Sequence, residues 1–360
     1  MNTTDTKKER LASLDILRGF DLFLLVFFQP VFLAFLGNTG LDWMQPLCHQ
    51  LDHEVWNGFR FWDLVMPLFL FMTGASMPFS FSKYQGTRGD WVLYRKIIKR
   101  FIVLFILGMV VQGNLLGLDW EHLYIYTNTL QAIASGYLFT ALIFLNFSIS
   151  RQILIGGLLL VIYALPFLLT GDYTPEGNFA NWVDQLLLGR FRGDPSYTWI
   201  WSTLTFTVTV LLGSFAGRIM KKGTRNKKMV IARLWCIAVL LMILAGICSI
   251  WMPVNKRIWS ASMTLLSGGY CFMLMGLFYY WIDYKGHRRG LEWLKFYGMN
   301  SITAYLLGEV INFRSIAQSV SYGLQPYLGD YYPAWLTFVN FLILFLILRW
   351  MYRHQIFLKI

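Results

Sequence analysis

Charged residues are scarce in this sequence. Only 14% of its 360 residues are Asp, Glu, Lys or Arg, whereas a soluble globular protein has roughly 25%. Nine stretches of 18 residues or more contain no charge, and each is long enough to cross a hydrocarbon core about 30 Å thick as a helix. The composition therefore excludes a water-soluble domain.

Cysteine is scarce too, and no close Cys-x-x-Cys pair occurs. The four residues are Cys48, Cys236, Cys248 and Cys271. Three of them fall inside apolar runs, so the sequence predicts neither a disulfide framework nor a zinc site, and no metal is expected. Linkers and low-complexity segments are missing as well, which predicts one membrane domain over residues 1–360.

The apolar runs predict an all-α, polytopic membrane helical bundle. A transmembrane β-barrel would instead alternate apolar and polar residues over about ten positions per strand. About ten transmembrane helices are expected. They lie near residues 13–36, 61–82, 99–117, 124–147, 152–170, 197–217, 231–252, 258–282, 293–312 and 333–350. The first run continues past any small-residue cleavage site, which favours a retained span over a signal peptide.

The net charge of +12 follows this pattern of spans. With the N-terminus inside, 25 of the 31 Lys and Arg fall in the termini and in alternate loops, whereas most acidic residues fall in the other loops. Basic residues belong at cytoplasmic span ends. The expected topology is therefore N-in and C-in. The basic excess is explained by topology and by attraction to anionic lipid, so nucleic acid is not expected as a partner.

Ionisable residues at membrane depth are costly, which makes each one a functional candidate. Asp15 and Arg18 lie three residues apart at the inner end of the first span, where they could pair or act as a cap at the membrane boundary. Asp63 opens the second span, where a carboxylate could stabilise the positive end of the helix dipole or belong to a site.

The densest polar cluster runs from Cys48 to Gly58 and leads into the second span. It contains His49 and His53 beside several carboxylates. A His of near-neutral pKa can take and return a proton, as acyl transfer to an amine or hydroxyl requires. The alternative is a solvated interfacial His, and metal binding by the two His would need further ligands that are not evident.

Several motifs resemble the heparan-α-glucosaminide N-acetyltransferase family and its bacterial relatives. They are Ser13-Leu14-Asp15 with Arg18-Gly19, His53 followed by Trp56-Asn57-Gly58, Asp63-Leu64-Val65-Met66-Pro67, Leu130-Gln131-Ala132, Pro253-Val254-Asn255-Lys256-Arg257-Ile258-Trp259, and Gly298-Met299-Asn300. The resemblance runs nearly the full length. The block from His53 to Pro67 is its most specific part.

This resemblance implies an acetyl-CoA-dependent N-acetyltransferase in a bacterial inner membrane. Acetyl-CoA would be the donor substrate on the cytoplasmic side, and an amino sugar or related glycan would be the acceptor on the periplasmic side. The same resemblance implies that His53 is the catalytic His, which acts as general base or as transient acetyl carrier. Asn57 and Asp63 shape its site, and Gln29 takes the place of the family's catalytic Asn on the first span.

Two further groups of residues are candidates for binding the substrates. At the inner end, Asp15, Arg18, Lys99 and Arg100 are the candidates for CoA, although cations there also fit the positive-inside rule. For the acceptor we expect contacts from side chains of the outer loops and late spans. These are Trp56, Lys256, Trp259 and Asn300.

A second class of function remains open at this point. Ten spans with a polar centre also suit a transporter of an amino sugar or N-acetylglucosamine, and an inactive scaffold is a third alternative. Transporters often carry broken helices in two halves. The interruptions at Phe28-Gln29-Pro30 and Leu165-Pro166 do not repeat convincingly. The sequence does not define the oligomeric state, for which a homodimer is one alternative.

Overall fold

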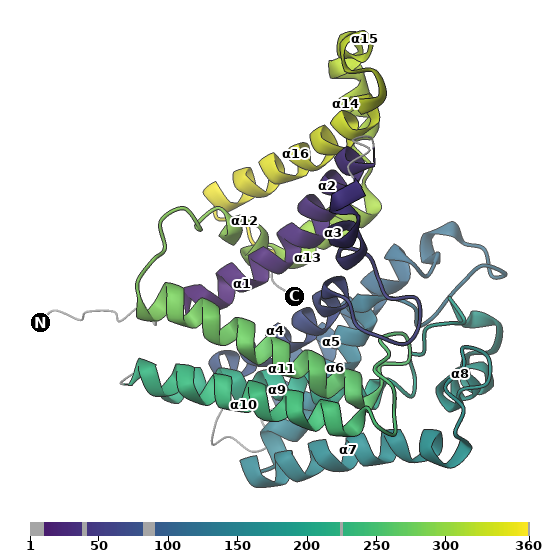
Figure 1. Ribbon diagram of the computed structural model, residues 1–360, viewed down its shortest axis with the longest axis vertical. Coiled ribbons are helices and arrows are strands. Elements are labelled where there is room, and N and C mark those ends of the chain that lie inside the picture. Colours follow the sequence, from purple (N-terminus) through teal and green to yellow (C-terminus); the bar gives the residue numbers. More distant parts are fainter. Residues whose placement is uncertain (1–10, 38–41, 82–90, 224–225, 359–360) are drawn as a thin grey trace, which may run out of the picture.

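The computed structural model describes residues 11–37, 42–81, 91–223 and 226–358, and within these ranges the chain is helical and has no strand. Long helices run side by side to form a bundle (Figure 1). In the first half of the chain the helices are α1 (Ala12–Phe23), α2 (Gln29–Leu36), α3 (Gln45–Gln50), α4 (Val65–Ser80), α5 (Trp91–Val111), α6 (Thr129–Asn146), α7 (Ile149–Thr170) and α8 (Phe179–Leu188). In the second half they are α9 (Thr203–Lys222), α10 (Lys227–Cys248), α11 (Ala261–Phe278), α12 (Leu294–Met299), α13 (Ser301–Val310), α14 (Arg314–Ser321), α15 (Gln325–Leu328) and α16 (Tyr332–Arg353).

Eight helical segments of the described chain are long and apolar enough to cross a membrane. The chain is therefore a polytopic helical membrane protein, as the sequence predicted. Two of the ten predicted spans fall outside these eight. The predicted span 99–117 corresponds to α5, which begins among several cations and ends at Val111, three residues before Asn114 with its left-handed φ of 57°. The predicted span 293–312 is divided at Asn300 into α12 and α13.

The predicted inner loops gather at one end of the bundle. Lys221 Nζ, at the end of α9, donates to the carbonyl oxygen of Pro78 near the end of α4 at 2.6 Å. Lys227 Nζ, at the start of α10, donates to the carbonyl oxygen of Asp283 at 2.6 Å, and the backbone N–H of Ser13 donates to the carboxylate of Asp283. Segments next to three predicted inner loops and the start of α1 therefore share one end, as alternating spans require.

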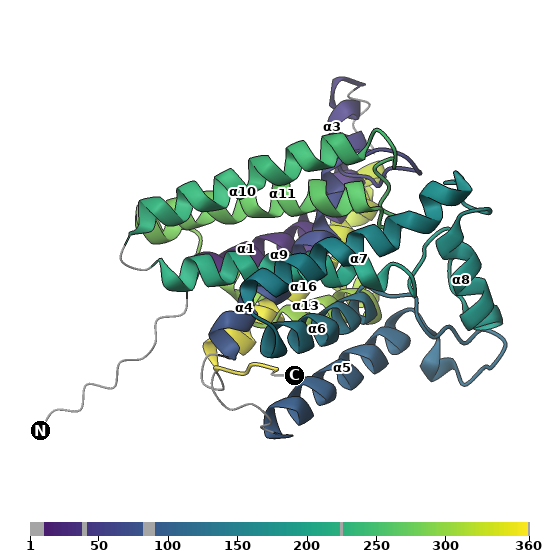
Figure 2. The same cartoon turned by 90° about the horizontal axis from the view of Figure 1, so that it is seen from below.

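The predicted outer loops gather at the opposite end, together with α8. The N–H of Gly58 donates to Val254 O at 2.8 Å, and the N–H of Thr198 donates to Arg257 O at 3.1 Å. In both ribbon views α8 lies at the end of the bundle away from the N-terminal end of α1 (Figures 1 and 2). The separation of the two loop sets agrees with the predicted alternation, while the N-in and C-in orientation stays a prediction.

The centre of the bundle is built on close contact between α4 and α9. A Cβ added at Gly74 would overlap the carbonyl oxygen of Val210, and one added at Gly213 would overlap that of Phe71. Small residues let two membrane helices approach until their backbones touch. Because Asp63 lies in the 3₁₀ turn Phe61–Leu64 that leads into α4, this contact fixes one side of the polar site described next.

The first helix changes its winding next to Gln29. Between α1 and α2 the segment Leu24–Phe28 is a π-helix, which ends directly before Gln29-Pro30. Proline has no N–H to donate, so the regular i to i−4 hydrogen-bond pattern of the helix is interrupted at Pro30. The π-helical turn before it accommodates the missing hydrogen bond. This turns Gln29 so that its Nε2 donates to the carbonyl oxygen of Leu51 at 3.0 Å.

Candidate active site

Three ionisable side chains meet at the N-terminal end of α4, where the predicted outer loops gather. His53 Nδ1 lies 2.9 Å from Asp63 Oδ1. Lys256 Nζ lies 2.9 Å from His53 Nδ1, 3.1 Å from His53 Nε2 and 3.7 Å from Asp63 Oδ1. Asp63 and Lys256 are buried, whereas the His53 side chain is 39% exposed. The His53 imidazole is thus in contact with two buried groups, the carboxylate of Asp63 and the amine of Lys256.

Asp63 caps the start of the second span and also contacts His53. Its Oδ2 accepts hydrogen bonds from the backbone N–H of Arg60 at 3.0 Å and of Glu54 at 3.3 Å. The first of these caps the 3₁₀ turn Phe61–Leu64 that leads into α4. Its Oδ1 is left to face His53, so one carboxylate both starts the helix and orients the imidazole.

The loop that carries His53 is closed by an ion pair. The Arg60 guanidinium donates to both carboxylate oxygens of Glu54, at 2.9 and 3.2 Å. Gly58 has a φ of +137°, a conformation that favours glycine, and a Cβ there would press on the Glu54 side chain. The glycine of the Trp-Asn-Gly motif therefore permits the tight loop that holds His53 above Asp63.

Lys256 is presented by a second tight turn. Asn255 is fully buried, and its Oδ1 accepts from the N–H of Arg257 at 2.8 Å and of Ile258 at 3.2 Å. Its Nδ2 donates to Oδ1 of Asn57 at 3.2 Å. The two asparagines thus tie the loop of His53 to the loop of Lys256 across almost two hundred residues of sequence.

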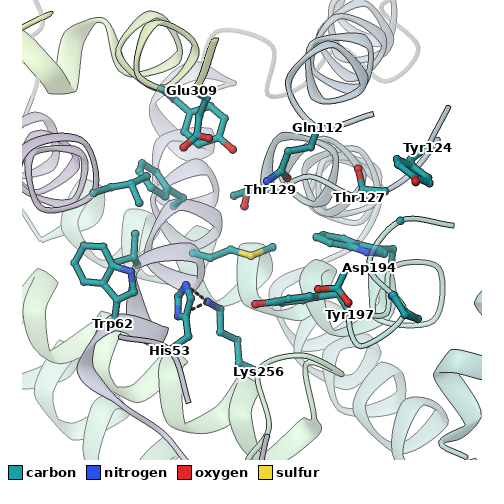
Figure 3. Close-up of a pocket in the computed structure, with 18 residues that line it drawn as sticks. His53, Trp62, Gln112, Tyr124, Thr127, Thr129, Asp194, Tyr197, Lys256 and Glu309 are labelled. Carbon is teal, nitrogen blue, oxygen red and sulfur yellow. Dashed lines mark hydrogen bonds between the residues drawn. The ribbon is translucent and has the colours of Figure 1, made fainter. Parts of the chain in front are cut away.

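His53 and Lys256 line a cavity of about 640 Å³, which we call the outer cavity because it lies at the end with the predicted outer loops. Both lie on one side of it, and Glu309 lies on the opposite side (Figure 3). The rest of the lining combines aromatic rings with amide, hydroxyl and carboxylate groups. It includes Trp62, Phe69, Gln112, Tyr124, Thr127, Thr129, Asp194, Tyr197, Trp199 and Tyr305. A concave pocket in which apolar rings surround convergent polar groups is typical of a small-molecule site.

Two ionisable side chains, Asp184 and Arg257, position the part of the cavity lining around Tyr197. Asp184, on α8, accepts from the backbone N–H of Trp199 at 2.8 Å and of Ile200 at 3.0 Å. The Arg257 guanidinium lies 5.0 Å from the centre of the Tyr197 ring. Because Arg257 follows Lys256 in the chain, the same turn positions both the cavity wall and the amine.

Burial dominates the acid–base behaviour of the cluster. It lowers the pKa of His53 below its ordinary value, which Lys256 also lowers, while the hydrogen bond to Asp63 acts in the opposite direction. Burial likewise lowers the pKa of Lys256 to about 8, against the attraction of Asp63. In Glu54 the Arg60 guanidinium lowers the pKa of the carboxyl group. Neutral imidazole and a partly neutral amine are therefore both accessible near neutral pH.

A second, inner cavity of about 80 Å³ adjoins the first. Arg18, Thr73, Arg100 and Ser301 contribute its polar lining, and it shares Phe69, Thr129 and Tyr305 with the outer cavity. Arg18 Nη2 donates to Ser76 Oγ at 2.6 Å. The Nε of Arg100 is buried without a hydrogen-bond partner, and its guanidinium lies 4.5 Å from the centre of the Tyr137 ring.

Four of the predicted site residues line these cavities, namely His53, Lys256, Arg18 and Arg100. Asp63 is in direct contact with two of them. Gln29 and Asn57 line neither cavity, and each holds a loop instead. Gln29 bonds to the chain two residues before His53, and Asn57 bonds to the chain one residue before Lys256.

The other predicted residues lie away from both cavities. Trp56 donates its indole N–H to Tyr173 O at 2.7 Å, and Trp259 is 2% exposed and packs edge-on against Phe206. The side chain of Asn300 is buried at the break between α12 and α13, Lys99 is exposed on α5, and Asp15 lies one turn before Arg18 on α1. We assign Trp259 to packing, because an indole enclosed by the core has no face open to a substrate, whereas Trp56 is partly exposed and lines neither cavity.

Sequence reasoning missed most of the residues that line the outer cavity beside His53 and Lys256. Tyr197 precedes α9, whereas Tyr305 and Glu309 lie four residues apart on α13, and no local motif joins these two distant segments. The burial of Asp184 was missed too, since a carboxylate in a predicted outer loop resembles a solvated one. The aromatic run Tyr197-Thr198-Trp199 next to an apolar span is a sequence signal that could have indicated this part of the cavity lining.

Comparisons with known proteins agree with the resemblance drawn from the motifs. Residues 10–116 match a family described as a domain of unknown function, DUF5009. The chain is 27% identical to human heparan-alpha-glucosaminide N-acetyltransferase over 84% of its length, and 26% identical to the mouse protein of that name over 86%. It spans 53% and 55% of those two proteins, respectively. The chain is thus a distant relative of these acetyltransferases and covers about half of their length.

Proposed function

We propose that this protein is a transmembrane acyltransferase. It passes an acetyl group from acetyl-CoA, taken up at the inner end of the bundle, to the amine of an amino sugar in the outer cavity. The observation that carries the proposal is the Asp63–His53 pair at the side of a cavity that adjoins a second one lined by Arg18 and Arg100. The relationship to two N-acetyltransferases supports the same class of reaction.

In this mechanism His53 is the general base. The Asp63 carboxylate accepts the Nδ1–H, which leaves the lone pair of the imidazole on Nε2. The acceptor amine attacks the thioester carbonyl carbon, its proton passes to Nε2, the C–S bond breaks, and the CoA sulfur leaves as thiolate and takes a proton. A positioned base contributes typically 10²–10⁴-fold in rate.

The two cavities suit different parts of the substrates. An inner cavity of about 80 Å³ admits the slender arm of CoA and not its nucleotide, so the phosphates lie at its mouth. Guanidinium groups are suited to phosphates, and Arg100 offers an unpaired Nε–H. The larger outer cavity offers aromatic faces for a sugar ring and the carboxylates Asp194 and Glu309 for its amine and hydroxyls.

The proposal includes a sidedness. With N-in and C-in topology the inner cavity faces the cytoplasm and the outer cavity faces the periplasm of a bacterial cell. This orientation supplies acetyl-CoA from the compartment where it is made. An impermeant thiol reagent added to intact cells should label a cysteine placed at Asn178 and not one placed at Lys227.

Activity measured with purified protein in detergent tests the proposal. Acetyl-CoA and glucosamine are supplied, and N-acetylglucosamine is measured by mass spectrometry. We expect His53→Ala to lower transfer at least about a hundredfold. The matched control is His49→Ala, because His49 lies on α3 with an exposed side chain and lines neither cavity. Equal losses in both variants, or a loss in neither, would refute the role of His53; uptake of sugar into vesicles without acetylation would point to a transporter.

A further inference from the structure

Lys256 places a primary amine within hydrogen-bond reach of His53, the proposed base. Its Nζ lies 3.1 Å from His53 Nε2, the ring nitrogen that carries the lone pair when Asp63 accepts the Nδ1–H. A base can take a proton only from a group within hydrogen-bond reach, about 2.6–3.2 Å. Lys256 Nζ also lies 2.9 Å from His53 Nδ1 and 3.7 Å from Asp63 Oδ1. The carboxylate, the imidazole and the amine therefore form one compact cluster, in which the amine is within reach of the ring nitrogen that serves as the base.

We infer that Lys256 is itself an acylation site: when an acyl donor enters the cavity without an acceptor, the donor acylates Lys256 Nζ with His53 as base. The inference rests on the proposed function, and extends it from transfer to a sugar to self-modification. Lys256 is on the lining of the cavity of about 640 Å³, so a donor that reaches His53 also reaches this amine.

The reaction balances without any further reagent. The ammonium of Lys256 first releases one proton to water through His53. The neutral amine then forms a C–N bond with the acetyl carbonyl carbon while the C–S bond of the thioester breaks. The second amine proton passes through His53 Nε2 to the departing sulfur, which yields N-acetyl-Lys256, free CoA and one proton in solution.

The surroundings favour the nucleophilic form of this lysine. Its side chain is 8% exposed, and Arg257 adds a neighbouring positive charge, whereas Asp63 alone opposes them. Burial lowers the pKa of Lys256 to about 8. A desolvated lysine with a depressed pKa is the usual form of a nucleophilic amine. Acetylation would remove the charge and place an amide against His53, which closes the site to an acceptor amine.

Mass spectrometry of the full-length protein tests this inference. The purified protein is incubated with ¹³C-labelled acetyl-CoA, and in a parallel sample with p-nitrophenyl acetate, an acyl donor that needs no CoA site. We expect label on Lys256 in the wild type, a loss of at least about a hundredfold in His53→Gln, and protection by excess glucosamine. Lys222, exposed at the end of α9, reports ordinary chemical acetylation in the same digest.

The outcomes separate this inference from the proposed function. If glucosamine is acetylated while Lys256 stays unlabelled by both donors, the inference is wrong and the proposed function stands. Labelling of Lys256 at the rate of Lys222, or equally in His53→Gln, also overturns the inference. If p-nitrophenyl acetate labels Lys256 in a manner that depends on His53, while acetyl-CoA transfers nothing, the acylation site stands and the proposed function fails. Thermal unfolding of His53→Gln shows whether that variant is folded.

Discussion

Replacing Asp63 by asparagine should disable the proposed base while keeping the shape of its site. An asparagine has one acceptor oxygen, which serves the cap best at the position of Oδ2, where the N–H groups of Arg60 and Glu54 converge. Its NH₂ group then faces Nδ1 of His53. An NH₂ donor there requires the lone pair on Nδ1, so the proton moves to Nε2, and the imidazole can no longer accept a proton from the cavity side.

The size of the effect follows from this change of tautomer. Replacing the carboxylate of an Asp–His–nucleophile triad by its amide lowers turnover about 10⁴-fold, which corresponds to about 5 kcal/mol of transition-state stabilisation. The variant also leaves Lys256 without its counter-ion at 3.7 Å. Because burial lowers the pKa of Lys256 to about 8, the amine can lose its proton near neutral pH, so the loss in folding stability should be only about 1 kcal/mol.

Turnover of glucosamine and thermal unfolding, measured on the same preparations, separate these two effects. We expect Asp63→Asn to reduce acetylation by about 10³–10⁴-fold with a small shift in the unfolding midpoint. The double variant Asp63→Asn/Lys256→Met removes both charges and should recover stability without recovering turnover. A single variant that keeps a tenth of the wild-type rate would refute the claim that Asp63 sets the tautomer of His53.

Three further predictions concern the supports of the site. Gln29→Ala removes the hydrogen bond to the loop of His53, so the free energy of unfolding, measured with denaturant, should fall by about 1 kcal/mol. In the acetylation assay its turnover should fall less than that of His53→Ala. Arg100→Ala should weaken acetyl-CoA binding about tenfold in calorimetry, whereas Lys99→Ala, on the exposed face of α5, should not; equal effects would contradict the assignment. Because burial and Lys256 lower the pKa of His53, kcat should rise with pH and level off below about 6.5, and Lys256→Met should move that rise to higher pH.

The architecture could be predicted because membrane spans are defined by composition. The length of a charge-free run can be read from the sequence without knowing which helices pack against it. The predicted spans 152–170 and 258–282 therefore lie close to α7 and α11. Helix ends depend on local groups that hydropathy ignores. The predicted start at 124 is five residues early, because Asn128 caps α6 by accepting from the N–H of Leu130.

The partner of His53 could be predicted only in part. Asp63 lies ten residues further on, within one loop and one turn of helix, so the sequence already placed the two together. Lys256 lies 203 residues from His53, and the sequence placed it merely at the outer surface as a ligand for the acceptor. Its approach to the imidazole depends on the bond between Asn57 and Asn255, which neither loop specifies alone.

Residue type alone does not distinguish a catalytic histidine from an interfacial one, and His49 and His53 illustrate why. Both lie in the same polar loop, four residues apart, with similar neighbours in sequence. His49 ends on the exposed side of α3, where water solvates either protonation state. His53 faces a fully buried carboxylate, because Asp63 must turn inward to cap the helix that follows. A requirement of helix initiation thus supplies the anion that selects one tautomer, and the search for a base in similar membrane proteins should begin with the histidine whose loop ends on a buried capping carboxylate.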